Sequence, residues 1–142
     1  MKRFQFSLQA ALTIRERTVE LAENAVRAVQ NEWNHNQEKQ RQLIEEVRTA
    51  ELAVRQKNVD PADLAALDRY RVAAQRRRTR MAEEATLIGR RLAERRAVLQ
   101  KAELDRTLLV RLREKALVRW QMEYEKEQQL LAEEAYLSRW GR

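Results

Sequence analysis

The chain has 142 residues, of which 36% are charged and 6% aromatic, with 2 Gly, 1 Pro and no Cys. So few turn residues argue against an ordinary globular domain, and the lack of cysteine excludes disulfides and thiolate metal sites. The formal net charge is +7, and no apolar run is long enough for a secretion signal or a membrane span. The composition therefore predicts long helices that bury a stripe of side chains.

The first helix is predicted over about residues 5–57. Steps of four and three residues from Leu8 meet mostly apolar positions, which is the heptad pattern of a left-handed coiled coil. Asn36 and Gln40 interrupt this seam beside His35, and we interpret the three as a polar layer that fixes register. The positions of the seam are Leu8, Leu12, Arg15, Val19, Ala22, Val26, Val29, Trp33, Asn36, Gln40, Leu43, Val47, Ala50 and Val54.

A turn is predicted at about residues 58–61, around the one proline of the chain. Pro61 disfavours helical geometry in the residue before it and suits the first position of a new helix. Asp60 then stands where an N-cap side chain accepts a hydrogen bond, and Asp63 complements the positive end of the helix dipole. The segment predicts the end of one helix and the start of another.

The second helix is predicted over about residues 62–139, and it continues the same seam with arginines at intervals. The long stem of such an arginine covers the groove while its guanidinium reaches a glutamate across it. Gly89 is a weak point that permits close approach or a bend. The seam positions are Leu64, Leu67, Arg71, Ala74, Arg78, Met81, Ala85, Ile88, Leu92, Arg95, Leu99, Ala102, Arg106 and Leu109.

These elements predict an all-α fold: two long helices forming an antiparallel coiled-coil hairpin, the second longer than the first, as a single unit over residues 1–142. Folding back at residue 59 sets Leu8 near Val110. The last ~30 residues of the second helix then have no first-helix segment to cover them. Because this tail contains Trp120, Met122, Tyr124, Tyr136 and Trp140, we interpret it as a docking surface.

The sequence predicts no enzyme. A two-helix rod offers no enclosed pocket for catalysis or for a small-molecule substrate, and no catalytic, metal or cofactor residues are predicted. His35 has no Cys or His companion, and the 2 glycines cannot form a phosphate loop. Arg76, Arg77, Arg78 and Arg80 spread around the helix, and we interpret them mainly as solvated surface. The sequence therefore argues against a nucleic-acid partner.

The two ends of the chain resemble the FliJ family of flagellar type III export proteins. The opening Arg3-Phe4-Gln5-Phe6-Ser7-Leu8, followed by Leu12 and Arg15-Glu16, is similar to the family's Phe-x-Phe-x-Leu start. The far end is also similar, from Leu112-Arg113-Glu114-Lys115 through Glu127-Gln128 to Glu133-Glu134-Ala135, with Glu133-Glu134 where the family often has Asp-Glu. The resemblance covers essentially the whole chain.

The resemblance implies a stalk-like coiled coil that binds the hexameric export ATPase and couples it to a membrane export-gate protein and to export chaperones. It implies a cytoplasmic location, peripheral to the inner membrane at the flagellar base. The end with both termini would engage the ATPase, through Phe4, Phe6, Leu8, Leu109, Arg113 and Trp120. Residues nearer the turn would face the gate: Leu43, Val47, Leu67, Tyr70 and Ala74.

Three alternatives stay open at the level of sequence. The first is the related stalk protein of a virulence type III secretion system. The second is a free coiled-coil chaperone or adaptor without an ATPase partner. The third is a basic, nucleic-acid-associated coiled coil, whose binding would fall steeply with salt.

Overall fold

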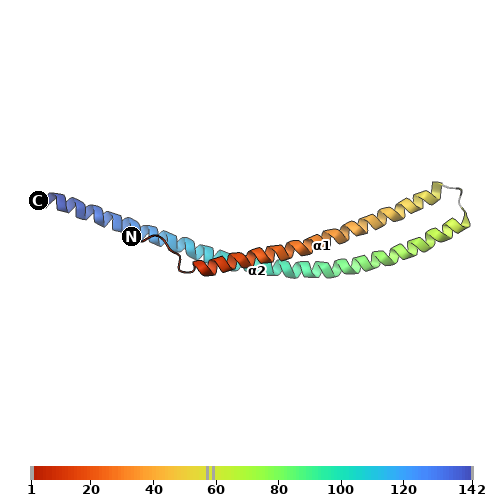
Figure 1. Ribbon diagram of the computed structural model, residues 1–142, viewed down its shortest axis with the longest axis horizontal. Helices are drawn as coiled ribbons and strands as arrows, with labels where there is room; N and C mark the ends of the chain where they lie inside the picture. The colour runs from red at the N-terminus through yellow and green to blue at the C-terminus, as the bar shows by residue number, and fades with distance from the viewer. Residues whose placement is uncertain (1, 57, 59, 142) are drawn as a thin grey trace. The chain divides into compact units, whose positions relative to one another are not determined.

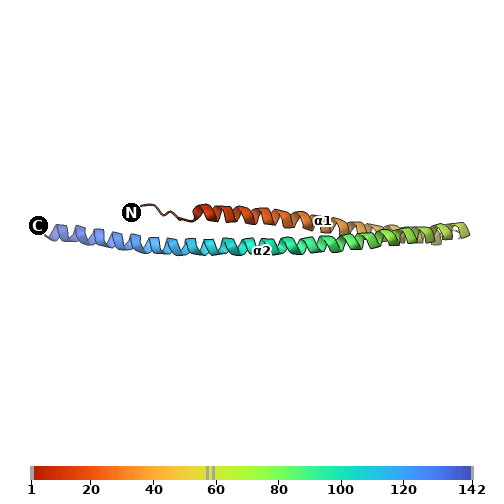
Figure 2. The same ribbon diagram turned by 90° about the horizontal axis from the view of Figure 1, so that it is seen from below.

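The computed structural model describes residues 2–56, 58 and 60–141 and consists of two helices. Helix α1 spans Gln9–Gln56 and helix α2 spans Pro61–Trp140, with 48 and 80 residues. No strand occurs in these described ranges. The helices run in opposite directions and pack side by side, as Figures 1 and 2 both show. The predicted fold, a helical hairpin with a longer second helix, is confirmed.

Residue contacts group the chain into two units. One unit contains Met1–Leu21 and Leu99–Arg142, and we call it the terminal unit. The other contains Ala22–Val98, and we call it the turn unit. Each unit combines a segment of α1 with a segment of α2 and has its own seam between them.

The buried side chains of both units lie on the predicted heptad positions. Val19 is 2% exposed and Leu12 is 3% exposed, whereas Ile14, outside the seam, is 65% exposed. A 4–3 spacing turns these positions to one side of each helix, so the two stripes bury each other. The buried residues are Leu12, Val19, Ala22, Val29, Asn36 and Leu43 on α1, and Leu67, Ala74, Ala85, Leu92 and Ala102 on α2.

The polar layer in the turn unit is hydrogen-bonded across the helix pair. Asn36 is 4% exposed, and its Nδ2 donates to the backbone carbonyl of Met81 at 3.1 Å. Gln40 Nε2 donates in turn to Asn36 Oδ1 at 2.6 Å. Because both ends of the buried amide have partners, its burial does not leave an unsatisfied polar group. The inclusion of His35 in this layer is wrong, because His35 is exposed and the layer consists of Asn36 and Gln40.

Two of the seam arginines reach an acid on the opposite helix. Arg15 Nη1 lies 3.4 Å from Asp105 in the terminal unit, and Arg71 Nε lies 3.0 Å from Glu51 in the turn unit. Their side chains remain about half exposed, at 48% and 44%. Surface pairs of this kind contribute only about 0 to 1 kcal/mol each. They cover the groove edges while the buried apolar residues supply most of the stability.

The register agrees with the predicted fold-back to within about four residues at the contacts of Asn36, Glu51 and Trp33. The buried Asn36 contacts Met81, next to its predicted partner Ala82. Surface Glu51 instead meets Arg71, beyond its predicted partner Leu67. Side chains tilt toward the N-terminus of their own helix, so in an antiparallel pair an acid and a base lean toward each other from offset positions.

Asp60 begins α2 as predicted. Its Oδ1 accepts a hydrogen bond from the backbone N–H of Ala62 at 3.1 Å, and its carbonyl accepts from Asp63 and Leu64. Pro61 occupies the first helical position, where a missing N–H costs nothing. The predicted turn also includes residues 57 and 59, which lie outside the described residues.

Helix α1 begins about one turn later than the predicted start near residue 5. A turn at Ser7 and Leu8 precedes it, and the N–H of Gln9 donates to the carbonyl of Phe6 at 3.0 Å. Phe4 and Phe6 lie before this turn in a segment without helix. Phe4 packs against α2 and Phe6 lines a hollow with Arg113 of that helix, as described below.

Gly89 of α2 faces Trp33 on the opposite helix. A Cβ built at Gly89 would lie 3.4 Å from Cζ3 of Trp33, an ordinary contact distance. We expect Gly89→Ala to stabilise the protein by about 0.5 to 1 kcal/mol, because alanine favours the helix more strongly than glycine. A larger side chain would press on the indole, so Gly89→Leu is expected to cost about 1 to 3 kcal/mol.

Urea denaturation followed by circular dichroism measures both Gly89 effects. A rise in the midpoint for the alanine variant and a fall for the leucine variant would agree with the Trp33 contact. A lower midpoint for the alanine variant would contradict it, because it would mean that the helices need a closer approach than the contact distance implies.

Candidate functional site

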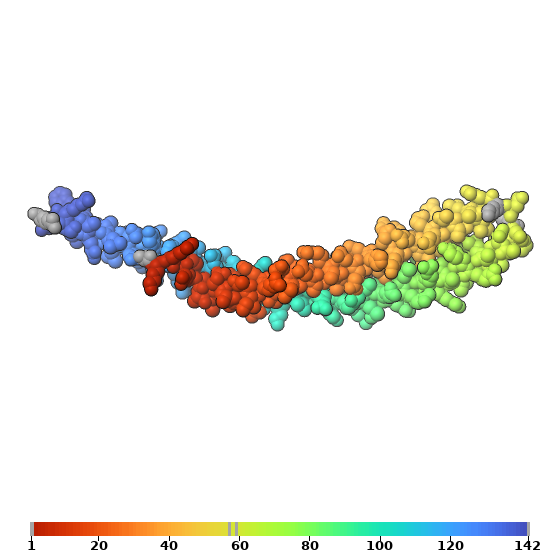
Figure 3. Space-filling model, in the orientation of Figure 1, coloured from red at the N-terminus to blue at the C-terminus, as the bar shows by residue number. Residues whose placement is uncertain are grey.

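The N-terminal segment, residues 2–8, lies along the C-terminal half of α2 in the terminal unit, as the space-filling view shows (Figure 3). Phe4 packs edge-on against Trp120, with ring centroids 6.0 Å apart. Trp120 stacks on Tyr124 at 5.5 Å, and the guanidinium of Arg113 lies 5.8 Å from the Phe4 ring centroid. We call Phe4, Arg113, Trp120 and Tyr124 the aromatic cluster.

Spacing along α2 brings the helix side of this cluster together. Arg113, Trp120 and Tyr124 are seven and four residues apart, so they share one face of the helix. In the segment before α1, Phe4 and Phe6 are both half-buried. The indole Nε1 of Trp120 donates to the carbonyl of Lys2 at 3.1 Å. Ring packing and this hydrogen bond together hold the segment on the helix.

Most residues predicted to face the ATPase meet in this region. Phe4, Phe6 and Arg113 line a surface hollow of about 380 Å³ together with Gln5 and Gln9. Trp120 adjoins it through Phe4. The two remaining candidates also belong to the terminal unit: Leu109 on α2 is half-buried, and Leu8, in the turn before α1, is 43% exposed.

The prediction of an uncovered tail is correct for part of α2 and wrong for another part. Every described residue from 128 to 141 is exposed, including Leu137 at 66% and Trp140 at 77%. Tyr136 and Trp140 pack on each other with ring centroids 5.8 Å apart. Trp120, by contrast, is half-buried because the N-terminal segment lies on it. The heptads did not reveal this contact, because Lys2 and Phe4 precede the predicted helix start near residue 5.

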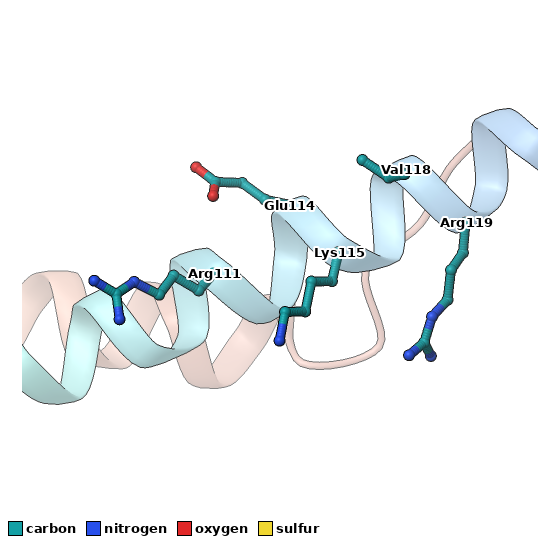
Figure 4. Close-up of a pocket in the computed structure, with 5 residues that line it drawn as sticks. All are labelled: Arg111, Glu114, Lys115, Val118 and Arg119. Carbon is teal, nitrogen blue, oxygen red and sulfur yellow. The ribbon is translucent and has the colours of Figure 1, made fainter.

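A second surface hollow, of about 400 Å³, lies on α2 beside a row of basic side chains (Figure 4). Arg111, Lys115 and Arg119 follow one another at intervals of four residues. Lys115 and Arg119 point to one side of the helix, while Glu114 and Val118 point to the other. We call Arg111, Lys115 and Arg119 the basic row. The terminal unit therefore presents aromatic, apolar and cationic groups, which suits binding to a protein surface.

The residues predicted to face the gate lie in the turn unit, and most of them belong to its seam. Leu43, Leu67 and Ala74 are buried, at 4%, 8% and 6% exposure. Val47 and Tyr70 are half-buried. Leu43, Val47 and Ala74 also line a hollow of about 160 Å³, whose rim includes Arg71 and Arg78. A partner can reach Val47 and Tyr70 without separating the helices.

Sequence reasoning missed Tyr124 as a member of the aromatic cluster and missed the basic row. Both have a helical spacing that could have revealed them, four residues after Trp120 and at four-residue intervals from Arg111. The N-terminal contact with α2 had no such signal.

The described residues contain no group of three or more His, Asp or Glu side chains placed to hold a metal ion. Within the same ranges, neither helix has a stretch long and apolar enough to cross a membrane.

The geometry defines the class of protein. It is a two-helix hairpin whose second helix is longer than the first and whose aromatic cluster joins the N-terminal segment to α2. Comparison with protein-family models, with curated proteins and with solved structures finds no match.

Proposed function

We propose that the protein is a non-enzymatic stalk of the flagellar type III export apparatus, of the FliJ kind. It binds the hexameric export ATPase and couples it to a membrane export-gate protein and to export chaperones, in the cytoplasm at the base of the flagellum. The proposal rests on the resemblance of both ends of the chain to that family. The observation that supports it most is the aromatic cluster, which joins the Phe-x-Phe opening to the distant Arg113 and Trp120.

The aromatic cluster has the chemistry of a protein-binding surface. Aromatic and arginine side chains supply much of the binding energy at protein interfaces. Phe6 and Arg113 line an open hollow there, and α2 continues to Trp140 with exposed apolar side chains. In this proposal the ATPase ring binds the terminal unit.

The gate contact in this proposal involves Val47 and Tyr70 in the turn unit. Leu43, Leu67 and Ala74 pack between the helices and support those two positions from beneath. In this proposal the helix pair couples binding of one partner to binding of the other. The pair must therefore stay formed while both partners are bound.

Binding and stimulation of the cognate export ATPase test the proposal. We expect the wild-type chain to bind the ATPase and raise its ATP turnover. Replacing both Phe4 and Phe6 by Ala is expected to weaken the binding about tenfold or more, because interface aromatics of this kind contribute at least ~1.4 kcal/mol.

Tyr70→Ala is the matched control for the two phenylalanines, since it removes an aromatic ring from the turn unit. It is expected to leave ATPase binding unchanged and to weaken binding to the gate protein. Absence of any ATPase binding by the wild-type chain would overturn the proposed function. Equal losses from the phenylalanine and Tyr70 variants would contradict the assignment of the terminal unit to the ATPase.

A further inference from the structure

The turn unit contains one side of α2 where positive charge is concentrated and not neutralised. Arg69, Arg76 and Arg80 lie there within about 40° of one another, because offsets of seven and eleven residues complete nearly whole turns of an α-helix. Arg77 lies about 80° around the helix from Arg69, at the edge of this side. Lys39 of α1 joins them, lining a hollow of about 250 Å³ with Arg77 and Arg80. We call these five residues the arginine face.

Arg78 does not belong to this face. It lines the hollow with Leu43 and Ala74, at the edge of the helix pair. The four neighbouring arginines, which the sequence predicted to spread around the helix, are thus divided: Arg77 and Arg80 line the hollow with Lys39. Arg76 lies on the side of Arg69 and Arg80 by its helical spacing.

The arginine face differs in its ion pairing from the arginines that meet an acid on the opposite helix. Arg71 pairs with Glu51 and Asp68, and Arg91 Nη2 lies 2.7 Å from Glu32. Across the described residues, no ion pair within 4.0 Å involves any member of the arginine face. Glu84 lines the same hollow and yet forms no such pair. Clustered cations without counter-ions repel one another, and an anionic partner removes that repulsion.

The chemistry of this face suits phosphate groups spread over a surface. Four of its five members are arginines, whose planar guanidinium binds phosphate oxygens in a bidentate manner. All five are exposed side chains on the outside of the helix pair. Exposed Ala73 and Val72, the latter 54% exposed, lie among the arginines and add small apolar contacts. A basic helix surface with interspersed apolar groups binds anionic membranes.

We propose that the arginine face binds the surface of an anionic phospholipid bilayer directly. The contact is peripheral, and it does not depend on the ATPase or on the proposed export function. An acidic peptide fits less well, because the hollow is lined mostly by charged side chains and gives a peptide little apolar surface. Single-stranded nucleic acid normally stacks on aromatic groups, of which Tyr70 is the one nearby.

Sedimentation with lipid vesicles tests this proposal using the full-length chain alone. The probes are phosphatidylcholine vesicles with and without phosphatidylglycerol. The test variant replaces Arg76, Arg77 and Arg80 by Gln. We expect the wild type to bind only the vesicles with phosphatidylglycerol. We expect the variant to lose about a hundredfold in affinity, since each cation near such a surface contributes roughly fivefold.

The basic row provides a matched control for net charge. Replacing Arg111, Lys115 and Arg119 by Gln removes the same number of positive charges from the terminal unit, and we expect it to change vesicle binding less than about fivefold. Replacing Arg76, Arg77 and Arg80 by Lys keeps the charge, and this variant is expected to retain most of the binding. Circular dichroism verifies that all variants keep their helices.

Three results would overturn the proposal. One is equal binding to vesicles with and without phosphatidylglycerol. Another is an equal loss of vesicle affinity in the arginine-face and basic-row variants, which would mean that net charge alone explains the binding. The third is binding to a duplex DNA of the same phosphate concentration without binding to vesicles, which would assign the face to nucleic acid. None of these results bears on ATPase binding, so the two proposals fail separately.

Discussion

Trp120→Ala is expected to release the N-terminal segment from α2 while the two helices stay paired. The change removes the edge-on contact with Phe4, the stacking on Tyr124 and the hydrogen bond from Nε1 to the Lys2 carbonyl. An aromatic pair and a hydrogen bond each contribute about 0.5 to 1.5 kcal/mol, so the segment loses about 2 kcal/mol of its attachment. Because Trp120 is not among the buried seam residues, helix content should change little.

Limited trypsin digestion measures this release, through cleavage after Arg3 in the segment. Cleavage follows the population of the open form, so a loss of 2 kcal/mol corresponds to about thirtyfold faster cutting. Trp140→Ala is the control, since that side chain is 77% exposed and its ring packs on Tyr136. Trp120→Phe keeps a ring but loses the hydrogen bond, and an intermediate rate is expected. An unchanged rate in the alanine variant would show that the cluster does not hold the segment.

Release of the segment should also change binding to the ATPase in the proposed function. If the ATPase binds the aromatic cluster as a unit, Trp120→Ala weakens ATPase binding together with the attachment of the segment. If the ATPase binds α2 in place of the segment, the same variant exposes its site and the loss is smaller. Comparing the protease rate with ATPase affinity in the same variants separates these two outcomes.

Asn36→Asp is expected to be the most destabilising change of a single polar group in the protein. Asn36 is 4% exposed, and its Nδ2 donates to the carbonyl of Met81. An aspartate there has an oxygen in place of that donor, so a buried negative charge would face a carbonyl oxygen. Gln40 can still donate to the carboxylate, but no cation neutralises it, and a buried charge without an ionic partner costs about 3 to 5 kcal/mol. We expect the urea midpoint at neutral pH to fall accordingly.

Asn36→Leu gives the opposite expectation and serves as the comparison. A leucine continues the apolar seam and leaves Gln40, which is half-buried, to bond with water. Apolar replacement of a buried polar group is often neutral or stabilising, and we expect a gain of about 1 kcal/mol. The cost should appear as reduced specificity of pairing, seen as dimers in analytical ultracentrifugation. Destabilisation by leucine as large as by aspartate would mean that the hydrogen bonds themselves stabilise the pair.

Much of the fold follows from local pattern. The buried residues, from Leu12 to Leu43 on α1 and from Leu67 to Ala102 on α2, occupy heptad positions that can be counted along the sequence. The cap at Asp60 follows equally from its place before Pro61. These features depend on the period of the helix and on backbone geometry, which neighbouring residues determine.

The candidate site was predictable only in part. Phe4, Arg113 and Trp120 came from a resemblance at the two ends of the chain, and the structure brings them together. The heptad pattern could not predict their contact, because the described residues before Gln9 are not part of helix α1. The heptad pattern also could not predict which acid each arginine meets. Whether Arg71 meets Glu51, or Arg77 meets no acid, depends on how long side chains lean across the groove.

By itself the sequence determined that two helices form, where the second begins, and which face of each is buried, since apolar spacing and the properties of proline act over a few residues. Tertiary structure alone decided that the N-terminal segment, residues 2–8, lies on Trp120 and that residues 128–141 stay exposed. That outcome depends on where α1 starts relative to α2. It is fixed by packing between residues more than a hundred positions apart, for which no local pattern exists.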